Sequence, residues 1–338
     1  MFSPDEDIYA DTFRNTGLLL KVSGERYPVR ACAVKTICDR ARISGNALSK
    51  VDKRTLARIF NYCLNVAPGV ALLRHSEGKI SAVHGGDASE YAPLPIPELF
   101  RLTDEHLSKA FPGSAFAGGF FGHAIVSALW ELTDSGELLR AYRAAMAKHG
   151  VAPRITKPAL RLSPSDVGVS GTNLFPMLVY GGGKSITLGN PLKLEHQGGA
   201  SLTKFEAQLE MIFAQYTKAI NGLTGLLEIE IRHAVNCMTG VMKKIGLTKK
   251  LAFEAIDLFR AQYGEEPCTA HDVYYGICEA LFMQQCSGAD GLRLVHTEEK
   301  IARALTVRWP DYDMPGDVRW QGSGKENFHE TLELAQKM

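Results

Sequence analysis

The sequence contains no run of about 18 apolar residues, which is the length that a membrane-spanning helix requires. Its opening residues, MFSPDEDIYA, are acidic, whereas a secretory signal starts with basic residues and continues with an apolar stretch. These two absences argue against a membrane partner and against secretion. We therefore expect a cytoplasmic protein.

The sequence also lacks the cysteine spacing of disulfide-rich or metal-binding domains. Its seven cysteines include no C-x-x-C pair, and an odd number does not suit a disulfide framework. Such a set is typical of reduced thiols in a cytosol, and we expect most of these side chains to be small members of the core. The cysteines are Cys32, Cys38, Cys63, Cys237, Cys268, Cys278 and Cys286.

Local motifs of known enzymes are missing as well. There is no G-x-S-x-G nucleophile turn, and no cysteine lies in a recognised signature of a cysteine enzyme. The stretch SPSDVGVSG offers Ser163, Ser165 and Asp166, but serine and aspartate are also common turn residues. The sequence therefore predicts no catalytic residues, and a non-enzymatic protein is favoured.

What the sequence does contain is a composition typical of a globular protein, with 45% hydrophobic residues and a formal net charge of +1. The charge is unevenly distributed. Residues 26–58 hold nine basic and two acidic residues, and residues 138–161 hold six basic residues and no acidic one. Residues 265–338 hold thirteen acidic and seven basic residues. A basic front half and an acidic back half can serve a polyanion site and a separate partner surface, but solvated helix faces explain the same pattern.

Hydrophobic periodicity and turn signals predict an α+β protein. The expected order is an N-terminal helical pair, central antiparallel β-hairpins with inserted helices, and a helical C-terminal half. We expect residues 1–200 to form an α+β domain with basic N-terminal helices. Residues 201–308 are expected to form a helical region packed on that domain, and residues 309–338 an irregular tail.

Capping signals place several helix ends. Asp52 and Thr269 are expected N-caps, Thr203 to Glu206 fits a capping box, and Phe213 is expected on the apolar face of the helix that follows. Strands are expected at 70–74, 79–84, 123–132 and within the β-rich segment 158–194. Helices are expected at 30–43, 53–64, 95–111, 135–150, 201–220, about 226–246, 249–263, 269–286 and 298–306.

One short stretch, LVYGGGKSITLG, looks like the end of a phosphate-binding loop. The P-loop motif G-x-x-x-x-G-K-[ST] requires a glycine where this chain has Leu178. The residues after Ser185 alternate as in a strand and do not begin a helix. The stretch therefore predicts a β-hairpin with Lys184 as an exposed charge at its tip, able to meet a backbone phosphate.

A second stretch of interest contains metal-ligating residue types. His233 and Cys237 are four residues apart on an expected helix, and Cys268 and His271 are three apart near another helix start. Two ligands from each segment could close a tetrahedral zinc site. The alternative, which we favour, is that these side chains pack in the core and that no cofactor is present.

Read in order, several blocks resemble one family. The segment from RACAVKTICDRARI to IFNYCLN, the LLR hairpin, and Tyr91 and Pro93 before a helix resemble the phage/plasmid-like proteins grouped as domain-of-unknown-function family 932. The blocks SDVGVSGTNLFPMLV, EHQGG and CTAHDVYYGICEAL are similar to later parts of that family, although Tyr275 and Gly276 depart from its usual Asn. The resemblance spans roughly residues 28 to 305 and implies a protein of a phage, plasmid or integrated element. It implies no agreed activity and no catalytic residues.

These observations favour a nucleic-acid-binding protein of a mobile element, acting in replication, recombination or strand annealing. Its partner would be DNA or RNA, and a single strand is one form that this partner could take. The protein could also form a homo-oligomer. Phe120, Phe121 and Tyr180 could stack on bases. The alternative is an interaction protein that modulates a host system through its acidic half, and the third hypothesis is an enzyme with an unrecognised, metal-dependent site. The expected phosphate contacts are Arg30, Lys35, Arg40, Arg42, Lys53, Arg54, Arg58, Arg140, Arg143, Arg154 and Lys184.

Overall fold

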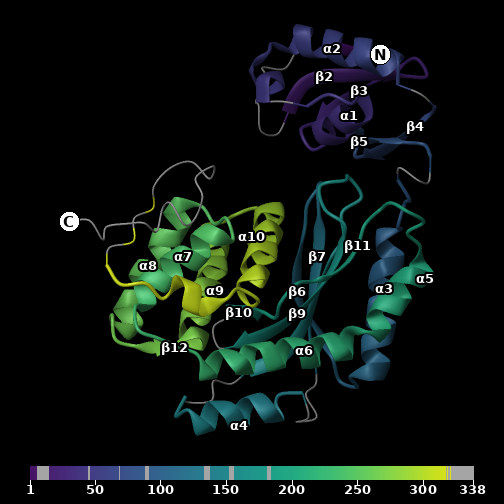
Figure 1. The fold of residues 1–338 in the computed structure, drawn as a ribbon. Helices are drawn as coiled ribbons and strands as arrows, with labels where there is room; N and C mark the ends of the chain where they lie inside the picture. Colours follow the sequence, from purple (N-terminus) through teal and green to yellow (C-terminus); the bar gives the residue numbers. More distant parts are fainter. Residues whose placement is uncertain are drawn as a thin grey trace.

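The computed structural model describes residues 1–5, 15–44, 46–67, 69–87, 91–132, 138–151, 156–180, 184–316, 318 and 320. Within these residues the chain combines helices with mainly antiparallel sheets, so the predicted mixed α+β class is confirmed. Figure 1 shows a small N-terminal unit and a larger unit that contains the rest of the described chain.

The N-terminal unit is a five-stranded sheet with two helices. Its strand order is β1-β2-β3-β5-β4, and every pair is antiparallel except β3 with β5. Phe2 and Leu18 from the first strands pack with Phe60 from the second helix to form a separate small core. The elements are β1 (Phe2–Pro4), β2 (Asn15–Val22), β3 (Glu25–Arg30), α1 (Ala33–Ala41), α2 (Lys53–Asn65), β4 (Ala71–Ser76) and β5 (Lys79–Gly85), with a short 3-10 helix at Asn46–Lys50.

The expectation that the chain opens with a helical layer is therefore wrong. Three strands precede the helical pair, and β3 pairs in parallel with β5, which lies about 50 residues further along the chain. No local turn signal announces a pairing of this kind, because parallel neighbours need a long crossover connection. Here α1, α2 and β4 make that crossover.

The larger unit is built on a second antiparallel sheet of strand order β10-β9-β8-β7-β6. The short strand β11 pairs with the first three residues of β9, which are Thr172, Asn173 and Leu174. Its elements are α3 (Ile96–Ala110), β6 (Ala115–Phe121), β7 (Val126–Glu131), α4 (Arg140–Lys148), β8 (Thr156–Ser163), β9 (Thr172–Tyr180), β10 (Lys184–Thr187), β11 (Leu192–Leu194), α5 (Leu202–Glu210), α6 (Ile212–Gly225), β12 (Glu230–Ile231), α7 (Ala234–Lys244), α8 (Lys249–Tyr263), β13 (Cys268–Thr269), α9 (Ala270–Cys286) and α10 (Gly291–Ala304), with 3-10 turns at Leu226–Glu228 and Trp309–Tyr312.

One continuous core joins this sheet to the helices that follow it. Leu178 of β9, Phe205 of α5 and Tyr274 of α9 belong to the same cluster of buried side chains. Buried hydroxyl groups reinforce the contact, since Tyr216 of α6 donates to the Ala159 carbonyl of β8 and Tyr274 donates to the Thr187 carbonyl. The core therefore contains side chains from both sides of residue 200. The sequence predicts a boundary there, between an α+β domain and a helical region packed on it.

Several predicted helices differ in detail. The helix expected over 201–220 is divided at Met211 into α5 and α6, and its N-cap is Ser201, whose side chain accepts from the Lys204 amide, so the capping box at Thr203 is wrong. Phe213 is 52% exposed and lies off the apolar face. The segment expected to be helical over 226–246 begins with a 3-10 turn and the strand β12, and the last helix, α10, starts at Gly291 instead of residue 298.

Other local predictions are confirmed. The Asp52 carboxylate caps α2, Thr269 and Asp272 form a capping box at α9, and α8 has the predicted bounds. The hairpin β4–β5 and the antiparallel pair β9–β10 also form as expected, although the tip of the second, residues 181–183, lies outside the described residues. In the part of the chain that the structure describes, no helix combines the length and apolar character needed to cross a membrane.

Candidate functional site

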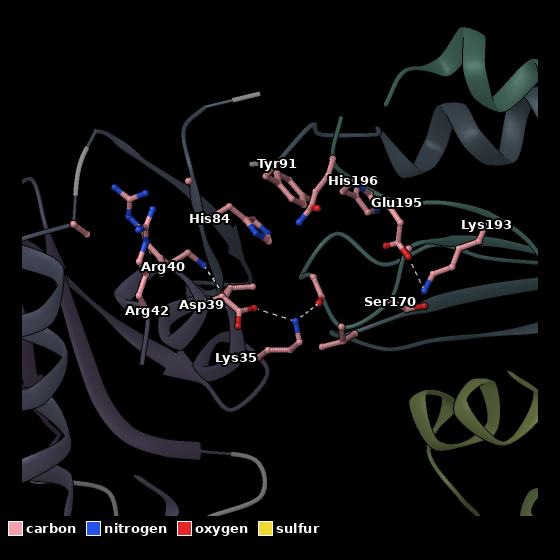
Figure 2. A pocket seen from close by; sticks show the side chains of 18 residues that line it. Lys35, Asp39, Arg40, Arg42, His84, Tyr91, Ser170, Lys193, Glu195 and His196 are labelled. Carbon is pink, nitrogen blue, oxygen red and sulfur yellow. Dashed lines mark hydrogen bonds and ion pairs between the residues drawn. The ribbon is translucent and has the colours of Figure 1, made fainter. Parts of the chain in front are cut away.

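A cavity of about 610 Å³ lies where the N-terminal unit meets the larger unit, and we call it the junction cavity. Its lining comes from α1, from β5, from Tyr91 in the segment that leads to α3, from the loop residues 168–171, from Lys193 of β11 and from residues 195–197 that follow this strand (Figure 2). Polar and charged side chains predominate among the residues that face it. The candidate site is therefore formed by tertiary contact between two units, each with its own core.

Helix α1 supplies most of the positive charge of this cavity. Lys35, Asp39 and Arg40 lie on the face of α1 that lines it, and the Lys35 ammonium is 3.0 Å from the Asp39 carboxylate. Arg42 follows at the C-cap with φ of 53°, a left-handed conformation that favours glycine. Its backbone N–H donates to the carbonyls of the last helical turn, and its side chain lines the cavity and is exposed.

Three flat rings form a stack in the wall of the junction cavity. The rings of His84 and Tyr91 are nearly parallel, with centroids 3.6 Å apart, and Tyr91 and His196 are stacked at 5.2 Å. Burial lowers the pKa of both histidines below its ordinary value of 6.5, and the pKa of Tyr91 is raised, again mainly by burial. At neutral pH the stack is therefore uncharged.

The loop that contains Asp166 connects this stack to the N-terminal unit. Tyr91 donates its hydroxyl proton to the Asp166 carbonyl at 3.1 Å, and a ring nitrogen of His84 lies 3.1 Å from the same oxygen. The Asp166 carboxylate accepts from Arg74 of β4 at 2.8 Å. Lys35 reaches across from α1 to donate to the Gly168 carbonyl at 2.9 Å. These contacts fix the position of α1 relative to the sheet of the larger unit.

The charge balance of the junction cavity favours anions. Among the described residues that line it, four side chains are basic and two are carboxylates, and the fourth base, Lys193, is 2.7 Å from Glu195. Each of these carboxylates is shared with one lysine, and neither is shared with Arg42, while the Arg40 guanidinium donates to the Gly69 carbonyl at 3.0 Å. Guanidinium groups match the geometry of phosphate oxygens well. The lining can therefore hold a phosphate beside flat, uncharged rings.

The structure brings together only some of the predicted phosphate contacts. Lys35, Arg40 and Arg42 meet at the junction cavity, whereas Arg30 is ion-paired with Glu77 at 2.8 Å and lies outside the lining. The bases of α2 do not line the cavity, and Arg140 and Arg143 lie on α4, at the end of the larger unit away from the N-terminal unit (Figure 1). Arg154 lies outside the described residues. The bases of α2 are Lys53, Arg54 and Arg58.

Lys184 is not the exposed charge that the hairpin predicts, so that expectation is wrong. Its ammonium lies 2.7 Å from the Glu279 carboxylate of α9 and over the ring of Phe282, and its side chain is only 25% exposed. Tyr180 donates to the same carboxylate at 3.1 Å. Because Glu279 is buried, it needs this cation, and Lys184 serves the contact between the hairpin and α9.

The four candidate zinc ligands do not form a site. Pairing of β12 with β13 brings their segments together, but His233 binds Asp313 at 3.2 Å and His271 lies 2.7 Å from the Tyr142 hydroxyl. Burial raises the pKa of both thiols, that of Cys268 to about 12, which disfavours the thiolate that a metal requires. Among the described residues, no three His, Cys, Asp or Glu side chains are grouped to hold a metal ion.

Sequence reasoning missed most of the non-basic part of the site. His84, Tyr91 and His196 are separated by up to about a hundred residues, and no spacing rule relates them. Tyr91 and His196 do occur in the blocks that resemble family 932, but the resemblance implies no chemical role for them. Lys193 lies in the β-rich segment, where single bases are common on exposed positions of strands.

Comparison with family models, with curated proteins and with solved structures found no match for this chain. The resemblance to family 932 therefore stays a prediction.

Proposed function

We propose that this protein binds nucleic acid and that the junction cavity holds part of the phosphate backbone. The observation that carries the proposal is the meeting of Lys35, Arg40, Arg42 and Lys193 around one cavity beside an uncharged aromatic stack. Basic side chains that gather around one site supply the phosphate contacts on which most nucleic-acid affinity depends.

The resemblance to family 932 supports a setting in a phage, plasmid or integrated element. In that setting the protein would act in replication, recombination or strand annealing. The bases of α4 have no part in the proposed interface, because they lie at the opposite end of the larger unit (Figure 1). Replacing two of these bases therefore provides a matched control, because it removes as much positive charge as the loss of two bases at the junction cavity.

The test is fluorescence anisotropy with a labelled DNA or RNA strand at low salt. We expect wild-type protein to bind, and the double variant Arg42→Ala, Lys193→Gln to bind at least about tenfold more weakly, since charged hydrogen bonds of this kind each contribute about 1.5–3 kcal/mol before solvent screening. The variant Arg140→Gln, Arg143→Gln loses the same charge on α4 and should bind as the wild type does. Absence of binding to either nucleic acid, or equal losses in both variants, would refute the proposal.

A further inference from the structure

A second cavity adjoins the junction cavity at the ring stack. It measures about 530 Å³ and shares His84 and Tyr91 with the junction cavity. Arg74 and Asp166 form its polar corner, and apart from His84 and Tyr91 the other described residues of its wall are apolar. We call it the apolar groove, and its apolar lining includes Leu72, Pro93, Pro95, Ile96, Phe121 and Val126.

The groove has an exposed aromatic side chain at its edge. Phe121, at the end of β6, is 73% exposed, although a phenyl ring in contact with water is unfavourable. The other two aromatic residues expected to meet bases are engaged elsewhere, since Tyr180 is buried and Phe120 packs against the α10 start, close to Gly291. Of the three, Phe121 alone is placed to stack on a ligand.

We propose that the junction cavity and the apolar groove together bind one single strand of nucleic acid, with its phosphates at α1 and its bases in the groove. This inference rests on the proposed function, and it adds the class of nucleic acid. The two cavities are adjacent, because His84 and Tyr91 line both of them. The basic lining and the apolar lining therefore meet at these two rings, as a strand with a charged backbone and flat bases requires.

The apolar groove is what selects a single strand. In a duplex the faces of the bases are stacked on one another, so an apolar wall can reach them only in a strand that is unpaired. A site that used the α1 cations alone would bind single strands and duplexes through phosphates without this distinction. The preference for unpaired bases is therefore the specific expectation of the two-part site.

The experiment compares three labelled ligands of about twelve nucleotides, within the range of known single-strand sites: a mixed-sequence single strand, the same sequence as a duplex, and an abasic strand that keeps the phosphates. Wild-type protein should bind the single strand about tenfold more tightly than either of the others. The variant Phe121→Ala should lose that advantage for the single strand and bind the abasic strand as the wild type does. The variant Phe116→Ala is the control, because Phe116 is 65% exposed on the same strand and lies outside the groove.

The outcomes separate this inference from the proposed function. If all three ligands bind equally and Phe121→Ala has no effect, while Arg42→Ala weakens all three, the protein binds phosphates and the groove does not hold bases. If no ligand binds at low salt, the proposed function fails together with this inference. Equal losses of affinity for the single strand in Phe121→Ala and Phe116→Ala would also contradict the proposal that the groove holds bases.

Discussion

At the residue scale, Arg42 combines an unfavourable backbone with a charged side chain at the junction cavity. A non-glycine residue in the left-handed region costs about 1–2 kcal/mol, and glycine is the usual residue at the end of a helix. Strained residues occur often at functional sites, where the side chain is needed for another purpose. The backbone of Arg42 is therefore consistent with a role in ligand binding.

This placement predicts opposite effects of one substitution. Arg42→Gly should raise the free energy of unfolding by about 0.5–1 kcal/mol, because relief of the left-handed strain exceeds the entropy cost of glycine in the folded state. The same variant should weaken nucleic-acid binding. Urea denaturation and anisotropy measure the two effects, and Arg42→Ala, which keeps the strain, should weaken binding without added stability. A less stable Arg42→Gly protein would contradict the conformational argument.

At the element scale, α9 contains a glycine with no room for a larger side chain. A Cβ atom at Gly276 would lie 2.6 Å from the Phe259 ring of α8 and 3.3 Å from Met238 of α7. Alanine normally stabilises a helix relative to glycine by about 0.8–1.0 kcal/mol. Here the close approach of the three helices reverses that expectation.

We therefore expect Gly276→Ala to lower the free energy of unfolding by about 1–3 kcal/mol, as in other overpacked cores. The matched control is Gly225→Ala at the end of α6, where φ is −60° and no described atom beyond its chain neighbours and its own helix backbone lies within 4 Å of the added Cβ. That change should leave stability unchanged or raise it by up to about 1 kcal/mol. Urea denaturation of both variants measures the difference, and a stabilised Gly276→Ala protein would contradict the packing argument.

Elements with local signals could be predicted from the sequence, and elements fixed by distant contacts could not. Asp52 and Thr269 cap their helices as expected, because a cap is a hydrogen bond to the next turn of the same chain. The strands β1 to β3 were missed, since β3 pairs with a strand about 50 residues away. The break at Met211 has no glycine or proline to mark it.

The same distinction holds for the site. The sequence identifies Lys35, Arg40 and Arg42 as a basic group, because they are close together along the chain. It does not identify the ring stack, because His84, Tyr91 and His196 meet only when the two units come together. Nor does it show that Lys184 is neutralised by Glu279, which is 95 residues away.

At the scale of the whole molecule, two histidines with lowered pKa values lie at the contact between the two units. Burial lowers the pKa of His84 and of His196, and for His84 the nearby Lys35 lowers it further while Asp166 opposes the shift. The unfolded chain then binds these protons more readily than the folded one. The free energy of unfolding should accordingly be highest above pH 6.5 and fall as the pH decreases through 6.5 toward the folded pKa values.

This pH dependence can be measured by urea denaturation at about pH 7.5 and about pH 5.5, on either side of the ordinary histidine pKa. The wild type should be less stable at the lower pH, and His84→Gln should reduce the difference, because one of the two depressed groups is gone. A protein that is equally stable at both values, or a difference that His84→Gln does not change, would contradict the assignment of the stack as neutral.

The central claim is that the junction cavity binds phosphates, and the salt dependence of binding tests it most directly. For a single strand, the slope of log affinity against log salt is about −0.7 for each phosphate neutralised, so the loss of two contacts should change the slope by about 1.4. We expect that change in the variant Arg42→Ala, Lys193→Gln and no change in Arg140→Gln, Arg143→Gln. Equal slopes in the wild type and the first variant would show that these side chains make no phosphate contact and would contradict the claim.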